Sequence, residues 1–209
     1  MRCGHKETAA FRLLGWPKIK PTPGAFIFWH IVNFPGGNVN KKAAVEAFTK
    51  VFDVWQKAMD KVEPPGRVIQ YESTPNFDQA HIKLVFVHPG LLTESFLCAD
   101  GQFRTFDIPS KLDGPGGVLA YVPRGNQTIF FDQGENWVAM GIDSQGEISL
   151  FDVALHEVGH THDLGHSNIA ASFMSAFYSY VSKGFQEDDY KALNQAWSKI
   201  KKHSNEPNE

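Results

Sequence analysis

Three histidines and a glutamate lie close together in the segment HEVGHTHDLGH, residues 156–166. His156 and His160 are four residues apart, so on a helix both imidazoles lie on one face and can bind one ion. His166 follows six residues after His160, which is too far to continue that face, so the chain must turn between them. Three imidazole ligands with an open position are typical of catalytic zinc. The alternative is a histidine-rich helix with surface or capping side chains.

Glu157 directly follows the first of these histidines and would flank the same cleft. Zinc lowers the pKa of a bound water towards neutrality. Glu157 could then take the proton of that water as a general base and deliver it to a leaving amine. The third histidine and the following Met174 agree with an extended zinc motif that includes a Met-turn. The segment therefore predicts hydrolysis of peptide bonds by a zinc-bound water.

Several elements must hold this segment in place. Ser149 and Asp152 fit a capping box that begins a helix running through His160. Apolar residues at helical spacing predict helices over residues 41–58 and 187–201. Apolar runs predict strands over residues 26–34, 67–71, 81–87, 118–122 and 128–131, with a long loop over 94–117. This order of elements favours a mixed α+β domain.

Composition restricts the class of protein. The chain has 209 residues, 42% of them hydrophobic and 13% aromatic, which is enough for a folded domain with a sizeable core. A net charge of −3 gives no electrostatic reason to expect nucleic acid or an anionic membrane as partner. No apolar run approaches the roughly 18 residues of a membrane helix, and no signal segment opens the chain. Cys3 and Cys98 are too few for a disulfide framework.

Beyond the motif, nearly the whole chain resembles the catalytic domain of the matrix metalloproteinases (matrixins), which belong to the metzincin clan. The resemblance rests on FIFWHIVNF (26–34), LDGPGGVLAY (112–121), FFDQGENW (130–137) and FQEDDYKALNQAW (185–197). It implies a metzincin-like zincin fold: a twisted, mixed, mostly parallel five-stranded sheet with three helices. The catalytic domain would span residues 11–203, with an N-terminal lobe to 166, a small C-terminal lobe over 167–203 and a polar tail over 204–209.

The first residues resemble the end of a matrixin propeptide. In this family an RCG tripeptide closes the propeptide, and its cysteine binds the zinc in the latent form. Arg2-Cys3-Gly4 stands at the front of this chain, so the resemblance implies a zymogen remnant over residues 1–10 with Cys3 as the latent-form zinc ligand. A thiolate binds zinc strongly and would displace the catalytic water. An incidental thiol, or a disulfide with Cys98, is the alternative.

The resemblance also predicts which further metals bind. Matrixins usually carry a structural zinc, but the matching positions here are Phe106, Ile108, Tyr121 and Phe130, none of which is a usual zinc ligand. We expect aromatic packing in its place. A different site made of His81, His88 and Asp107 is the alternative.

One structural calcium site is expected. Its carboxylates and its backbone carbonyl donors match Asp113, Asp132 and Glu135, and Gly114, Gly116 and Val118. An acidic turn without an ion is the alternative. A second family calcium site loses its aspartates, since His81 and Thr128 occupy those positions.

Asp163 stands where the family has a glycine. That glycine permits a left-handed backbone at the turn after the helix. Asp tolerates this conformation better than most residues, at about 1 kcal/mol or a little more, so we expect the turn to survive. The carboxylate could also accept a hydrogen bond from an imidazole or a backbone N–H. His162 should point to another face of the helix, towards the surface.

The resemblance implies that a protein or peptide substrate lies extended along the edge strand over residues 118–122, including Leu119 and Ala120, held by main-chain hydrogen bonds. Leu155 and Tyr178 would line an apolar specificity pocket. Met174 would form the hydrophobic base under the zinc.

The leading hypothesis is a secreted, extracellular zinc endopeptidase of the matrixin type that is monomeric and acts on extracellular matrix or other protein substrates. The rival hypothesis is a catalytically weak or inactive zinc-binding module that acts in protein interaction. Asp163 and the missing structural zinc motivate this rival. The intact Glu157 argues against it, because a module without catalysis has no chemical use for that group.

Overall fold

The computed structural model describes residues 26–62, 69–123, 125–141, 146–178 and 185–204. The predicted propeptide remnant, including Cys3, and the tail from residue 205 lie outside the described residues. No helix within the described ranges is both long and apolar enough to cross a membrane.

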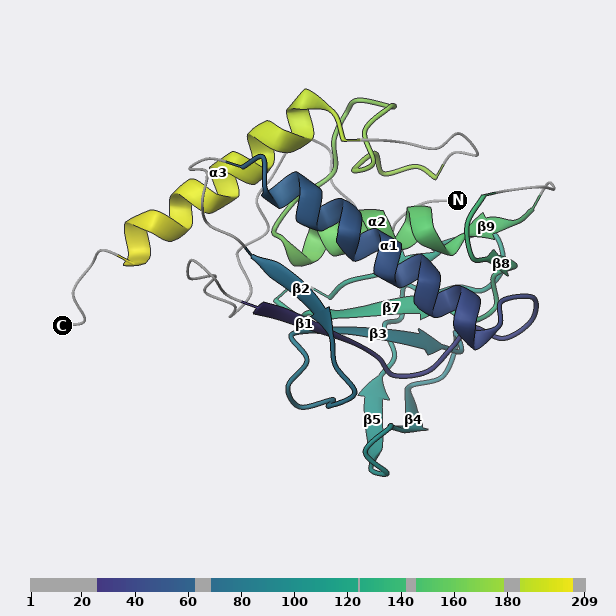
Figure 1. Ribbon diagram of the computed structural model, residues 1–209. Coiled ribbons are helices and arrows are strands. Elements are labelled where there is room, and N and C mark those ends of the chain that lie inside the picture. Colours follow the sequence, from purple (N-terminus) through teal and green to yellow (C-terminus); the bar gives the residue numbers. More distant parts are fainter. Residues whose placement is uncertain (1–25, 63–68, 124, 142–145, 179–184, 205–209) are drawn as a thin grey trace.

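A five-stranded sheet forms the centre of the fold (Figure 1). Its strands in spatial order are β2 (Gln70–Ser73), β1 (Phe26–Ile31), β3 (Ile82–Val87), β7 (Thr128–Asp132) and β6 (Ala120–Tyr121). All neighbours are parallel except β6, which runs antiparallel to β7 at the edge. The helices are α1 (Lys41–Met59), α2 (Leu150–Thr161) and α3 (Glu187–Ser204). The predicted mixed, mostly parallel five-stranded sheet with three helices is confirmed.

Helices α1 and α2 lie over the same face of this sheet (Figure 1). Phe48 and Trp55 of α1 are fully buried. The ring of Phe48 packs 6.3 Å from Phe86 of β3 and 5.7 Å from Phe131 of β7, centroid to centroid. Strand β3 is almost entirely apolar because both of its faces are covered. The main core therefore fixes α2, with its histidines, against the sheet.

Each predicted strand of the sheet is present, with shifted ends. The first strand ends at Ile31 rather than at residue 34. The side chain of Asn33 donates to the carbonyl of Phe86 and accepts from its N–H, both at 2.7 Å. Beyond Ile31 the N–H of Val32 still donates to the carbonyl of Leu84 at 2.9 Å, and from Asn33 on a side chain replaces the strand ladder. The strand predicted over 118–122 shortens to β6, Ala120–Tyr121.

The predicted loop over residues 94–117 is wrong in its first half. β4 (Thr93–Leu97) and β5 (Phe103–Asp107) form an antiparallel hairpin that extends from the sheet on the side opposite the helices (Figure 1). Leu97 and Phe103 pair across its outer face, where they are 60% and 71% exposed. Apolar residues on the outer face hide the alternation that identifies a half-buried strand. The short strands β8 (Trp137–Val138) and β9 (Ile148–Ser149) were also not predicted.

The four positions that replace structural zinc ligands join one apolar cluster beneath the hairpin: Phe106, Ile108, Tyr121 and Phe130. The rings of Phe106 and Phe130 meet edge to face at 6.2 Å. Phe77 and Phe96 each pack 6.0 Å from Phe106. Aromatic packing is present here, as expected.

The alternative metal group at this end of the molecule does not assemble. Nδ1 of His81 accepts the N–H of Phe28 at 2.9 Å. Nδ1 of His88 lies 2.8 Å from Oε1 of Glu94, and Asp107 pairs with Thr93 in the hairpin. The three residues thus have separate partners, and no metal-binding group among the described residues contains them.

Candidate active site

Helix α2 begins as predicted, with Ser149 as its N-cap. Oγ of Ser149 accepts the N–H of Asp152 at 3.2 Å, as in a capping box. The N–H of Ser149 donates to the hydroxyl of Tyr178 at 2.8 Å. Tyr178, a predicted pocket residue, therefore ties the segment beyond the histidines to the start of the helix.

The same helix ends in a Schellman turn. The N–H of Leu164 donates to the carbonyl of Gly159 at 3.0 Å, and the N–H of Asp163 to the carbonyl of His160 at 3.1 Å. This pair of bonds requires a left-handed residue after the C-cap, and Asp163 has φ of 67°. The predicted left-handed turn at Asp163 is confirmed. It redirects the chain so that His166 returns towards the helix.

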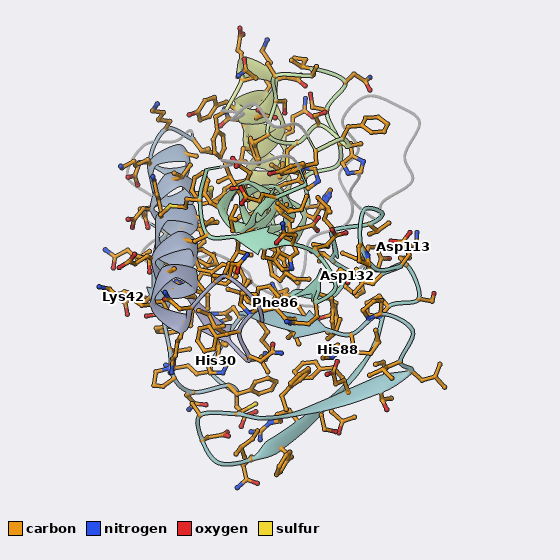
Figure 2. All side chains as sticks on the ribbon, turned by 90° about the vertical axis from the view of Figure 1, so that its right-hand side faces the viewer. His30, Lys42, Phe86, His88, Asp113 and Asp132 are labelled. Carbon is orange, nitrogen blue, oxygen red and sulfur yellow. The ribbon has the colours of Figure 1, made fainter. Side chains whose placement is uncertain are left out.

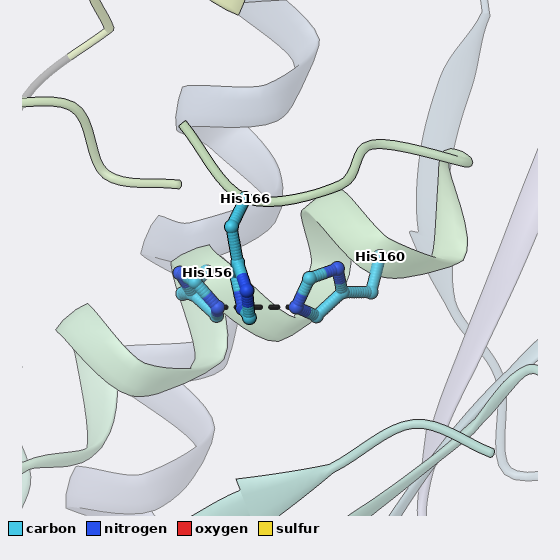
Figure 3. A group of neighbouring side chains, drawn as sticks. All are labelled: His156, His160 and His166. Atoms are coloured by element: carbon cyan, nitrogen blue, oxygen red, sulfur yellow. Dashed lines mark hydrogen bonds between the residues drawn. The ribbon is translucent and has the colours of Figure 1, made fainter. Parts of the chain in front are cut away.

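The turn brings the three predicted zinc ligands together (Figure 3). His156, His160 and His166 are 8%, 5% and 5% exposed. One nitrogen from each ring lies within 4.8 Å of the others, and the Nε2 atoms of His156 and His160 are 3.1 Å apart. A tetrahedral zinc with bonds of about 2.0–2.1 Å separates two ligand nitrogens by about 3.3 Å. The spacing therefore fits one zinc ion.

Backbone carbonyls set the ring tautomers. Nδ1 of His156 lies 2.7 Å from the carbonyl of Phe173, and Nδ1 of His160 lies 2.7 Å from the carbonyl of Leu164. A carbonyl only accepts, so each Nδ1 carries a hydrogen and the neutral ring directs a lone pair from Nε2. Burial lowers the pKa of His166 to about 4, which keeps this ring in the neutral form that binds metal. The donor set thus suits a cation at the meeting point of the rings.

Met174 packs beside Gly159, on the helix that carries two of the histidines. It is fully buried, its N–H donates to Oγ of Ser172 at 2.9 Å, and its carbonyl accepts from the N–H of Ser167 at 2.8 Å. A Cβ added at Gly159 would lie 2.3 Å from its sulfur. The absence of a side chain at Gly159 therefore makes room for the predicted Met-turn beside the helix.

A buried carboxylate supports the predicted Met-turn. This contact was not predicted from the sequence. Oγ of Ser172 donates to Oδ1 of Asp189 at 2.6 Å, and the N–H of Gln186 donates to Oδ2 at 2.7 Å. Asp189 is fully buried, and this burial raises its pKa. Asp189 lies at the start of α3, so these bonds link the last helix to the segment that contains Ser172 and Met174.

The expected surface position of His162 is wrong. The ring is 2% exposed, stacks on Trp55 at 4.7 Å between centroids, and its Nε2 is hydrogen-bonded to the hydroxyl of Tyr71. Burial lowers the pKa of His162 to about 4. Helix α1 and strand β2 cover the side of α2 on which His162 lies. The spacing of the motif gives no information about these neighbouring elements.

The predicted calcium ligands lie in the loop before β6 and at the end of β7, and hydrogen bonds join these two segments. Backbone N–H groups of Val118, Gly114 and Gly116 donate to Asp113, Asp132 and Glu135 at 2.7, 2.8 and 2.9 Å respectively. Figure 2 shows Asp113 towards one side of the molecule and Asp132 further inside, near it in this view. Burial raises the pKa of Glu135, and repulsion from the other two carboxylates adds to this effect. Carboxylate oxygens suit calcium, but the three carboxylates do not meet in a group that could hold a metal ion among the described residues, where His156, His160 and His166 do.

The predicted substrate-binding residues lie beside the edge strand and α2. β6 forms the edge of the sheet, and Ala120 in it pairs with Phe131. Leu119 accepts the N–H of Asp132 at 2.9 Å through its carbonyl. Leu155 is 3% exposed and belongs to the main core. Its predicted role in a pocket, like that of Tyr178, stays a prediction.

Comparison with known proteins agrees with this fold. The sequence model of the Matrixin family matches residues 22–198, so the chain belongs to the matrixin family. Matrix metalloproteinase-C of Caenorhabditis elegans is 35% identical over 168 residues, covering 75% of this chain and 25% of the relative.

Two other relatives match shorter stretches. Metalloendoproteinase 1 of Glycine max is 29% identical over 134 residues, which are 61% of this chain and 36% of the relative. Stromelysin-3 of Homo sapiens is 42% identical over 78 residues, which are 35% of this chain and 15% of the relative. The matched regions thus span between 15% and 36% of these relatives. Membership of this family supports a metalloendopeptidase kind of function.

Proposed function

We propose that this chain is a zinc-dependent endopeptidase that hydrolyses peptide bonds in proteins. The observation that carries the proposal is the buried group of three imidazoles, two of which have tautomers fixed by backbone carbonyls. His156, His160 and His166 would hold the ion. Zinc, when bound, supplies Lewis-acid polarisation of a carbonyl and lowers the pKa of a water.

Glu157 would be the general base. It follows the first proposed ligand on α2 and is 1% exposed, so its carboxylate is held in a site from which bulk water is largely excluded. A proton taken up at this carboxylate can be returned to the leaving amine. Met174 would support the site from below. The edge strand β6 would pair with the extended backbone of the substrate, including contacts at Leu119 and Ala120.

Calcium and latency complete the proposal. One calcium would bind Asp113, Asp132 and Glu135 together with carbonyls of Gly114, Gly116 and Val118, and would neutralise the three carboxylates. Cys3 would bind the zinc in a latent form, with the catalytic domain following over residues 11–203.

By analogy with relatives named as matrix metalloproteinases, we place the protein outside the cell, as a monomer acting on protein substrates.

A second candidate is a zinc-binding module without turnover. It is favoured by Asp163, whose left-handed backbone stores strain in the turn between two of the proposed ligands. The buried Glu157 on the same helix favours the enzyme.

The test is cleavage of a quenched peptide by a protein that begins at Phe11, which removes Cys3 and with it any latency. Activity in zinc and calcium should be lost with a chelator. Glu157→Gln should lower kcat by about 10²–10⁴-fold and still bind one zinc. A folded, zinc-loaded protein without turnover on a broad peptide panel would instead support the binding module.

A further inference from the structure

The turn at Asp163 has an unusual backbone for its residue type. Every other described residue with positive φ is a glycine, because glycine has no Cβ to collide with the following carbonyl. Asp163 is 4% exposed and lies between two proposed zinc ligands. The neighbouring structure must therefore hold this turn against the conformational preference of its own residue.

Three contacts fix the side chain directly before Asp163. Nδ1 of His162 lies 2.7 Å from the carbonyl of Val158, so this nitrogen carries the hydrogen. Nε2 can then accept the hydroxyl hydrogen of Tyr71. The ring stacks on Trp55 with an angle of 6° between planes. The C-cap of α2 is thereby tied to α1 through Trp55 and to β2 through Tyr71.

The same turn carries groups that orient the proposed ligands. The carbonyl of Leu164, one residue after Asp163, accepts from Nδ1 of His160 at 2.7 Å. The edge of Trp55 packs on Phe173, with ring centroids 5.4 Å apart. The carbonyl of Phe173 in turn accepts from Nδ1 of His156. A shift of the turn would move the group that holds one ligand ring and the chain that leads to His166.

We propose that Tyr71, His162 and Trp55 form a buried lock that positions the zinc centre by holding the left-handed turn at Asp163. They are positioning residues, which act through the turn and through the carbonyls of Leu164 and Phe173. The proposal rests on the zinc site proposed above. Glycine enters the left-handed region without steric cost, so the lock should matter when residue 163 is Asp and become dispensable when it is Gly.

The test is a double-mutant cycle read out as zinc affinity, because activity alone would not separate positioning from folding. The metal-free full chain competes with a chromophoric chelator for zinc, in wild type, Tyr71→Phe, Asp163→Gly and the double variant. Tyr71→Phe should weaken zinc binding about tenfold in wild type, the low end for losing an outer contact of a metal site. In the Asp163→Gly background the same change should weaken it less than about twofold.

Tyr178→Phe is the matched control. It removes a hydroxyl that binds the opposite end of the same helix, so any effect on zinc affinity should be equal in both backgrounds. His162→Phe keeps an aromatic ring against Trp55 and removes the polar contacts. It should show the same dependence on residue 163 as Tyr71→Phe. Thermal unfolding of each metal-free variant verifies that it is folded.

Equal weakening by Tyr71→Phe in both backgrounds would overturn the lock, because a merely structural role does not depend on residue 163. Unchanged zinc affinity in the wild-type background would overturn it as well. A protein that begins at Phe11 and binds zinc without cleaving peptides refutes the proposed peptidase but leaves the cycle readable. A wild type that binds no zinc overturns both proposals.

Discussion

Gly159→Ala should destabilise the protein, although alanine favours a helix more than glycine does. The added Cβ would lie 2.3 Å from the sulfur of Met174, 3.1 Å from its Cε and 3.3 Å from Cε2 of Phe173. Met174 is fully buried and both of its backbone polar groups are hydrogen-bonded, so it cannot move aside freely. Overpacking costs about 1–3 kcal/mol, and the 2.3 Å approach puts this case at the upper end.

The helix preference of alanine returns about 1 kcal/mol, which leaves a net loss of about 2 kcal/mol. For a domain of this size, the unfolding temperature should fall by roughly 4–8 °C. Circular dichroism during thermal unfolding of the metal-free protein measures this fall. An unfolding temperature at or above that of the wild type would refute the steric argument.

A double-mutant cycle identifies the side chain responsible. Met174→Ala alone should cost about 2–5 kcal/mol, because it leaves a cavity in the core. In the Gly159→Ala/Met174→Ala protein the new methyl group occupies part of that cavity. The two losses should therefore combine to about 1–2 kcal/mol less than their sum. Strict additivity would show that the clash with Met174 is not the cause.

Two further predictions concern the loop before β6 and the start of α3. A Cβ at Gly117 would lie 2.1 Å from Oδ1 of Asp113, which is a proposed calcium ligand. Gly117→Ala should therefore abolish the rise in unfolding temperature that calcium causes. A rise equal to that of the wild type would contradict the proposed site. Burial raises the pKa of Asp189 above its ordinary value of 3.8, so its stabilising contribution is present below about pH 3.8 and is lost as the pH rises through the raised folded pKa. Ser172→Ala removes a hydrogen bond to this carboxylate and should raise that pKa further, which a carbon NMR titration of Asp189 can check; an equal or lower pKa would count against the contact.

Patterns that depend on local spacing predicted most of the fold. Helix α1 was predicted over 41–58 and is present over Lys41–Met59, because its apolar positions recur on one face, which is buried against the sheet and against α2. The apolar residues over 81–87 predicted a strand, and the structure shows β3 there, covered on both faces. The hairpin of β4 and β5 was missed because Leu97 and Phe103 lie on its exposed face. Their apolar character says nothing about which side is covered.

The candidate site, like the fold, has features that local spacing predicts and features that depend on contacts between distant segments. The spacing of His156 and His160, and the need for a turn before His166, predicted the group that the structure brings together. The contacts of Asp189 with Ser172 and Gln186 join segments that are distant in the chain, and no local pattern indicates them. The expectation of aromatic packing at Phe106 and Phe130 came from comparing each position with a family, and the structure shows that packing.

The composition of α2 contains a signal that His162 is buried. The segment LFDVALHEVGHT of α2 contains no lysine or arginine, and ten of its twelve residues are buried. A helix without a charged outer face is covered on every side, so a polar residue that follows its last turn needs a buried partner. The composition of the helix therefore argued against a surface histidine. It favoured what the structure shows: a ring held by Tyr71 and Trp55, next to Asp163, whose positive φ is shared only by glycines among the described residues.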